Sequence, residues 1–391
     1  MKSLINILQI AAAEFRFIMR DHGVVLFVFF VPLLYPLLYA FIYTNETVRE
    51  VPVAVVDNAG SELSRKFVRM IDATPEVSVV ANCVSVAEAE RMNKLGDIYG
   101  IVVIPDDFDR TLANGEQAIV GVYADMAGML YYKSTLLGAT NASLALNKEL
   151  KSSRFYTGAT ARQEAIATQP VAYDYIPLFN PQGGFASFLM PAVMMLILQQ
   201  TLMLGLGMVG GGTRERFNGL ALPTARIYRN PFHIVWGKTL TYFLIYMLMA
   251  VYMFTVVTYL FGLPSLGDFW TFVAFMVPYV LACGYMGITF SSFVYRREDC
   301  ILLFVFMSVP LLFMSGISWP SSAVPEFWKW ISLLFPSTFA VNGYVRINSM
   351  GATLGQVSHE FIGLWIQAGV YFLISVMFYR RELHSRLHKK R

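Results

Sequence analysis

Charged residues are scarce in this 391-residue sequence, and their absence from long stretches is its most informative feature. Only 14% of the residues are charged, against 56% that are hydrophobic. Core helices of soluble proteins rarely avoid charge for long. Six charge-free runs approach or exceed the roughly 20 apolar residues needed to cross a bilayer: 24–43, 185–212, 239–266, 269–295, 300–324 and 361–379. A water-soluble protein is therefore excluded, and a polytopic membrane protein is predicted.

Cysteines and catalytic motifs are also scarce. The three cysteines fall in different places: Cys83 between the first two runs, Cys283 inside the fourth and Cys300 at the edge of the fifth. This distribution supports neither a disulfide framework nor a metal cluster. The motifs G-x-S-x-G and H-E-x-x-H do not occur, which leaves no motif for acyl transfer or metalloproteolysis. We therefore expect neither an enzyme nor a metal site.

Two sources of driving force are missing from the chain itself. Gly237-Lys238-Thr239 resembles the end of a phosphate-binding loop, but Phe232 stands where that pattern needs a glycine. The charge-free runs also lack the Asp, Glu, His, Lys or Arg side chains with which ion-driven carriers bind a moving proton or cation. Nucleotide hydrolysis by this chain and ion-coupled transport are both disfavoured.

Lysines and arginines indicate the orientation. Short cytoplasmic loops keep positive charge, whereas long translocated domains carry either sign. If both termini are cytoplasmic, the inner segments hold 16 of the 30 basic residues and six acids, while residues 45–180 hold 12 basic and 17 acidic residues. A basic inner face beside an acidic outer domain is typical of a membrane protein and does not indicate nucleic-acid binding. We predict that both termini are cytoplasmic.

Residues 1–22 have an amphipathic pattern. Five apolar residues recur there at helical spacing, with the basic residues off their stripe: Ile5, Leu8, Ala12, Phe15 and Met19. The pattern predicts a helix in the cytoplasmic membrane interface, serving either as an anchor or as a contact for a cytoplasmic partner. Residues 23–44 then form the first span, which lacks a small-residue cleavage site and is interpreted as a retained anchor.

Residues 45–180 have the pattern of a water-soluble α/β domain. Segments rich in β-branched residues predict strands at 51–57, 77–81, 99–105 and 118–124, with helices at 61–71 and 85–95 and one or two long helices over 126–169. Strands alternating with helices indicate a partly parallel sheet. Four aspartates fall where strands end and helices begin, so we interpret them as caps, with a carboxylate site as the alternative: Asp57, Asp106, Asp107 and Asp109.

Residues 181–391 hold the other five spans. The predicted fold class is therefore a polytopic helical membrane protein with six transmembrane helices and an α/β domain inserted between spans 1 and 2. Between spans 5 and 6, the segment 319–344 is broken by prolines and carries three tryptophans. Irregular backbone at membrane depth must be buried in protein or line a cavity, so we predict an external re-entrant hairpin over 318–360.

The second span holds the candidates for a substrate path. Gln199 and Gln200 are the most polar pair within the spans, and because neighbouring helical residues point about 100° apart, at least one can face a bundle interior. Met194 and Met195 offer adaptable apolar surface. For both pairs the alternatives are ordinary helix packing and a path for a lipophilic substrate.

The order of these parts resembles the ABC-2 type permeases, the membrane subunits of one class of ATP-binding-cassette exporters. The resemblance covers essentially the whole chain, including the strand VPVAVVD at 51–57 and the segment G-I-V-V-I-P-x-D-F at 100–108. It implies a subunit of the bacterial inner membrane that works as a homodimer or beside a paralogous permease. It also implies that ATP and Mg²⁺ bind to a separate cytoplasmic ATPase subunit, and that this chain binds no cofactor.

The family carries a cytoplasmic coupling loop after the second span, and residues 212–238 match much of it. The matches are a charged start, a glycine, a proline and a closing Gly-Lys pair: Arg214, Glu215, Arg216, Gly219, Pro223 or Pro231, Gly237 and Lys238. Phe217 and Leu220 depart from the pattern, standing where an acid and a threonine are usual. The resemblance implies that the loop docks into the ATPase; the alternative is a solvated loop that only follows the positive-inside rule.

Export driven by ATP is what the resemblance implies. Charge-free spans rich in aromatic and aliphatic residues favour an amphipathic or lipophilic substrate, drug-like or lipid-like, in contact with membrane lipid. The external domain is a candidate surface for a periplasmic adaptor protein. The alternative from another class is a membrane-anchored sensing or assembly protein whose external domain binds a ligand without transport.

Overall fold

The computed structural model describes residues 2–154, 178–181, 183–217, 220–223 and 227–389. The chain forms two compact units, one made of Met1–Glu46 with Pro177–Arg391 and the other of Thr47–Ile176. We call them the membrane unit and the inserted domain. The predicted helical membrane protein with an α/β domain between its first and second spans is confirmed.

Among the described residues, the membrane unit has five helical stretches long and apolar enough to cross a bilayer. The first, His22–Ile42, consists of α2 (His22–Val25), the π-helical segment η1 (Leu26–Phe30) and α3 (Val31–Ile42). The others are α9 (Phe185–Arg216), α10 (Pro231–Val251) with its continuation η2 (Tyr252–Val257) and α11 (Thr258–Leu260), α12 (Phe269–Ser291), and α17 (Ser358–Lys389). Helix α1 (Lys2–Arg20) precedes them and packs against α10.

The predicted fifth span, 300–324, is not one continuous helix. It is divided into α13 (Arg297–Phe306) and α14 (Ser308–Met314), with Met307 between them. Pro310 explains the break, because it has no N–H to donate to the carbonyl of Phe306 and its ring clashes with that carbonyl. After α14, the chain forms η3 (Ser321–Ala323), α15 (Glu326–Ser332) and α16 (Pro336–Met350). Trp319, Trp328 and Trp330 are exposed here; the re-entrant path of this segment stays a prediction.

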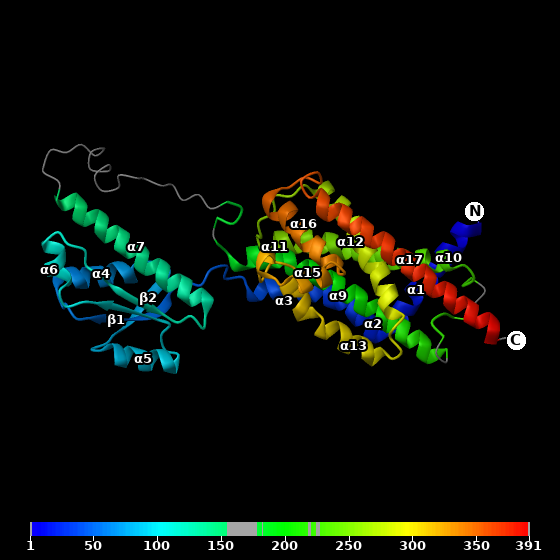
Figure 1. The fold of residues 1–391 in the computed structure, drawn as a ribbon, viewed down its shortest axis with the longest axis horizontal. Helices are drawn as coiled ribbons and strands as arrows, with labels where there is room; N and C mark the ends of the chain where they lie inside the picture. The colour runs from blue at the N-terminus through cyan, green and yellow to red at the C-terminus, as the bar shows by residue number, and fades with distance from the viewer. Residues whose placement is uncertain (1, 155–177, 182, 218–219, 224–226, 390–391) are drawn as a thin grey trace. The chain divides into compact units, whose positions relative to one another are not determined.

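Helix α9 is the centre of the membrane unit. It packs against α12, α13, α16 and α3, and nearly all its side chains between Met190 and Arg214 are buried. A helix that is apolar on every side suits either a protein core or lipid, and here the neighbouring helices bury it. Figure 1 shows α17 running along α12, its most extensive partner in the unit.

The inserted domain is built on a four-stranded sheet of order β2-β1-β3-β4. Strands β1 (Val51–Asp57), β2 (Val77–Asn82) and β3 (Gly100–Ile104) are parallel, and β4 (Gly121–Ala124) is antiparallel. Helices α4 (Glu62–Asp72), α6 (Phe108–Ala113) and α7 (Met129–Arg154) cover one face, and α5 (Val86–Leu95) covers the other (Figure 1). The predicted helix over 126–169 is one helix as far as Arg154, and the rest of that prediction lies outside the described residues.

Of the four aspartates predicted as caps, Asp57 makes local contacts and Asp107 makes no cap bond. Asp57 accepts hydrogen bonds from the backbone N–H of Ala59 and Gly60 and from the hydroxyl of Ser64. Ser61 caps α4, accepting from the N–H of Ser64 at 2.9 Å. Asp107 occupies the position before α6 without a side-chain cap bond. These contacts favour the structural interpretation of Asp57.

Three hydrogen bonds join the two points where the chain leaves and re-enters the membrane unit. The N–H of Phe185 donates to the carbonyl of Glu46 at 2.7 Å, and Ser187 donates to the Glu46 carboxylate through its hydroxyl at 2.7 Å and its N–H at 3.1 Å. Gly184 leaves room for that carboxylate, since a Cβ there would lie only 1.9 Å from Glu46 Oε2. The start of α9 is thereby fixed beside the end of the first span.

Candidate functional site

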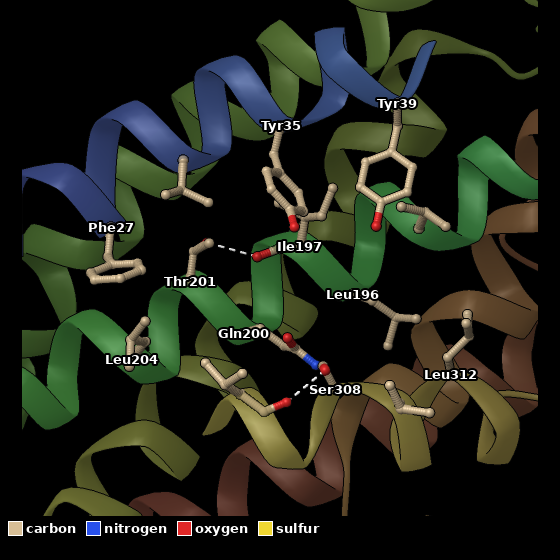
Figure 2. Close-up of a pocket in the computed structure, with 14 residues that line it drawn as sticks. Phe27, Tyr35, Tyr39, Leu196, Ile197, Gln200, Thr201, Leu204, Ser308 and Leu312 are labelled. Atoms are coloured by element: carbon tan, nitrogen blue, oxygen red, sulfur yellow. Dashed lines mark hydrogen bonds between the residues drawn. The ribbon is translucent and has the colours of Figure 1, made fainter. Parts of the chain in front are cut away.

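A groove of about 350 Å³ lies between the first span, α9 and the broken helix α13–α14. Figure 2 shows its walls, with Phe27, Tyr35 and Tyr39 on one side, the residues of α9 along the floor, and Ser308 and Leu312 opposite. Its lining is largely apolar: Phe27, Val31, Tyr35, Tyr39, Val193, Leu196, Ile197, Gln200, Thr201, Leu204, Val305, Ser308, Val309 and Leu312. None of these residues carries a formal charge.

The groove offers one uncommitted polar group from α9. Thr201 donates its hydroxyl to the carbonyl of Ile197 at 2.7 Å, and Ser308 donates to Val305 at 2.6 Å, so both hydroxyls are used within their own helical segments. The amide of Gln200 lies in the groove (Figure 2) and has no hydrogen-bond partner in the described part of the chain. It can therefore donate to and accept from a bound molecule.

The other predicted path residues lie elsewhere. Gln199 is fully buried and binds Ser337 twice, donating to its hydroxyl at 3.1 Å and accepting from its N–H at 2.7 Å, and Cys283 contacts the same amide oxygen. Met194 and Met195 are 2% and 0% exposed in the core and do not line the groove. This placement favours helix packing for these three residues and separates Gln199 from its neighbour.

Helix α1 exposes the stripe that its sequence predicts. Four of its apolar side chains are 43–52% exposed: Ile5, Leu8, Phe15 and Met19. The opposite face is buried against α10 through Ile10, Glu14 and Ile18. The exposed stripe suits a lipid surface or a partner, whereas the buried face was not anticipated.

Glu14 forms a buried ion pair with Lys238. Glu14 Oε1 lies 3.2 Å from Lys238 Nζ, and the two side chains are only 2% and 6% exposed. Gly237 makes the close approach possible, because a Cβ there would lie 2.7 Å from the Ile10 side chain and 2.9 Å from the Ile7 carbonyl. Gly237 and Lys238 therefore belong to the contact between α1 and α10. The sequence offers one sign of this buried face, because Glu14 lies four residues from both Ile10 and Ile18 and so shares a face of the helix with them.

The charged triplet of the predicted coupling loop ends α9. Arg214 is buried and donates to the carbonyls of Ser291, at 2.5 Å, and Val294, with its guanidinium over the rings of Tyr295 and Phe378. Glu215 and Arg216 are exposed, with side chains 44% and 48% accessible. Only these two members of the triplet are open to a partner.

The rest of that loop is partly anchored. The N–H of Ala221 donates to Glu382 Oε1 at 3.1 Å, and Leu222 is fully buried. Pro223 is half-buried beside them, and Gly219 lies outside the described residues. Tyr228 is buried near Glu14, and burial together with that negative charge raises the pKa of its phenol to about 12. Ala221, Leu222 and Tyr228 therefore anchor this part of the loop to the helices around it.

Comparison with known proteins points in one direction. Residues 22–377 match the model of the ABC-2 family transporter proteins. The chain is 23% identical to the inner membrane transport permease YhhJ of Escherichia coli (strain K12), over 98% of this chain and 99% of that protein. It is also 22% identical to the linearmycin resistance permease protein LnrN of Bacillus subtilis (strain 168), over 90% of this chain and 93% of that protein.

Proposed function

From the premise that this chain belongs to the ABC-2 transporter family and is a non-catalytic permease subunit, we propose that it exports an amphipathic or lipophilic molecule. The chain is a multi-pass permease of the inner membrane, and we place α1, the end of α9 and the C-terminus of α17 on the cytoplasmic side. ATP and Mg²⁺ bind to a separate ATPase subunit, whose hydrolysis supplies the driving force.

The lining of the groove beside α9 supports the proposed class of substrate. Its walls are apolar and uncharged, and the free amide of Gln200 is able to hydrogen-bond one polar group of a guest. Burying an ionised group there would leave its charge unpaired, which is strongly unfavourable. A lipophilic molecule with a neutral polar group fits this lining best. The name of LnrN, which ties that permease to linearmycin resistance, is consistent with a drug-like or lipid-like substrate.

The ATPase has two exposed features on which to dock. Glu215 and Arg216 project from the end of α9, and the apolar stripe of α1 lies open. Because the Glu14–Lys238 pair fixes α1 to α10, movement of α1 is transmitted to that span. Movement of Glu215 and Arg216 acts directly on α9, which they end. A second permease copy, identical or paralogous, completes the transporter. The inserted domain is the surface on which a periplasmic adaptor protein would bind.

Co-purification tests this assignment. The tagged full chain is isolated in mild detergent from its native host, and we expect an ATPase subunit to accompany it. Glu215→Ala with Arg216→Ala should reduce the bound ATPase by about tenfold, because exposed interface charges of this kind contribute on the order of 1 kcal/mol or more at a partner surface. Arg296→Ala with Glu298→Ala is the matched control, since both residues are exposed and the net charge change is the same.

Two outcomes would contradict the proposal. Equal loss of the ATPase in both double variants would remove the docking role from Glu215 and Arg216. An unaccompanied permease in every preparation would instead favour the membrane-anchored sensing or assembly protein. The substrate class is tested separately with Gln200→Leu, which should change export or binding of lipophilic compounds while ATPase association persists.

A further inference from the structure

The three helical walls of the groove converge on one charged cluster at the predicted cytoplasmic end. Asp21 caps the first turn of the first span, accepting from the N–H of Val24. Glu215 and Arg216 form the end of α9, which is the groove floor. Arg297 is the first residue of α13, the start of the third wall. Residues distant in the sequence thus meet where the walls begin or end.

Arg297 links the other members of this cluster. Its Nη2 lies 2.6 Å from Asp21 Oδ2 and its Nε lies 3.5 Å from Glu215 Oε2. Its backbone N–H also donates to Glu215 Oε1 at 3.1 Å. Arg216 Nη2 lies 3.7 Å from the same Asp21 oxygen. The side chain of Asp21 is 11% exposed and that of Arg297 is 30% exposed, so water screens these contacts less than at an open surface.

Helix α9 is shaped to receive Arg297. A Cβ on Gly212 would lie 2.5–2.9 Å from three guanidinium atoms of Arg297, and one on Gly211 would lie 3.0 Å from the carbonyl carbon of Arg296. A side chain at Gly212 would displace the guanidinium, and one at Gly211 would press on the backbone before Arg297. The end of α9 and the start of α13 are therefore fitted to each other around this side chain.

The cluster lies close to the groove along two of its walls. Phe27 lines the groove six residues after Asp21, and Val305 lines it eight residues after Arg297. At about 1.5 Å per helical residue, these separations are roughly 9 Å and 12 Å. A change in the cluster is thus transmitted to these walls through about two turns of helix.

We propose that Arg297 is a positioning residue of the transport cycle, whose guanidinium holds the cytoplasmic ends of the three groove walls together and closes the groove to the cytoplasm. This inference rests on the proposed function, because it takes the groove as the substrate path and Glu215 as part of the ATPase-docking surface. A partner that engages Glu215 competes with Arg297 for its carboxylate. Docking and opening are thereby linked through one side chain.

Cysteine accessibility tests this inference without a known substrate. Ser308→Cys places a thiol in the groove of a full-length protein whose Cys83, Cys283 and Cys300 are replaced by alanine. Inside-out membrane vesicles are treated with a membrane-impermeant maleimide, which reaches the groove only from the cytoplasmic side. Arg297→Ala and Asp21→Asn should each speed labelling about fivefold, which corresponds to about 1 kcal/mol, the upper range for a partly exposed ion pair. Arg297→Lys should give a smaller increase.

Two controls separate closure from general loosening. Arg296→Ala removes an exposed arginine that forms no ion pair among the described residues, and it should leave the labelling rate unchanged. A second reporter, Ser375→Cys, occupies a fully buried site and should stay unlabelled in every variant. Faster labelling of both reporters would mean that Arg297 only stabilises the fold, and would overturn the inference.

An unchanged Ser308→Cys rate in Arg297→Ala and Asp21→Asn would also overturn it. If Arg297→Ala fails to accumulate, the labelling rates of Asp21→Asn and Arg297→Lys decide between the two outcomes. Bound ATPase is scored on the same preparations without reporter labelling, so absence of the ATPase, which contradicts the proposed function, is distinguishable from absence of closure by Arg297.

Discussion

Replacing Lys238 by methionine should destabilise the contact between α1 and α10, because it leaves the carboxyl group of Glu14 buried without its partner. Both side chains are almost inaccessible, at 2% and 6% exposure, so little solvent screening reduces the cost. Breaking such a pair typically costs about 3–5 kcal/mol, whereas replacing both members by uncharged residues is often neutral.

The assay is the apparent unfolding temperature in detergent, with trypsin cleavage at Arg16 and Arg20 as a local readout of α1 release. We expect Lys238→Met to unfold at a lower temperature than the wild type and to be cleaved faster. The double variant Glu14→Gln with Lys238→Met should lie near the wild type in both readouts. A single variant as stable as the wild type, or a double variant as unstable as the single one, would refute the reasoning.

Two further predictions concern neighbours in sequence and contacts between helices. Gln199→Leu should lower the free energy of unfolding by about 2 kcal/mol, because the hydroxyl and N–H of Ser337 lose a buried partner. Gln200→Leu should leave the free energy of unfolding within about 0.5 kcal/mol of the wild type, as is usual away from buried polar networks. Thermal unfolding of the two variants side by side tests this difference. Gly237→Ala should displace α1, because the added Cβ would overlap Ile10. Trypsin should then cleave faster at Arg16. Gly369→Ala is the control and should not change the rate, because a Cβ there meets nothing within 4 Å.

The sequence predicts those features that depend on composition over many residues. Absence of charge is enough to place the spans, since hydrocarbon excludes unpaired charge whatever the helices pack against. Alternating strands and helices predict the inserted α/β domain in the same way. The divided helix α13–α14 could have been predicted from Pro310. The span was predicted from the absence of charge alone, and this criterion ignores the missing backbone N–H of a proline.

Contacts between distant residues were not predictable from local pattern. Glu14 looks like one polar residue on an interfacial helix until α10 brings Lys238 against it, 224 positions along the chain. Gln199 and Gln200 are chemically identical neighbours, and only the placement of α16 assigns one to the core and leaves the other in the groove. Arg214 and Arg216 differ likewise, because the helix rotation between them turns the first inward.

The contact of Glu46 with Phe185 and Ser187 closes the membrane unit at the point where residues 47–176 are inserted. Hydrogen bonds within the membrane unit hold the two insertion points together, so its first two spans stay adjacent without help from the inserted domain. Insertions at such closed junctions cost little loop entropy, and this is where domains are exchanged between proteins. The inserted domain can therefore diverge, lengthen or be replaced while the helices that surround the groove keep one architecture.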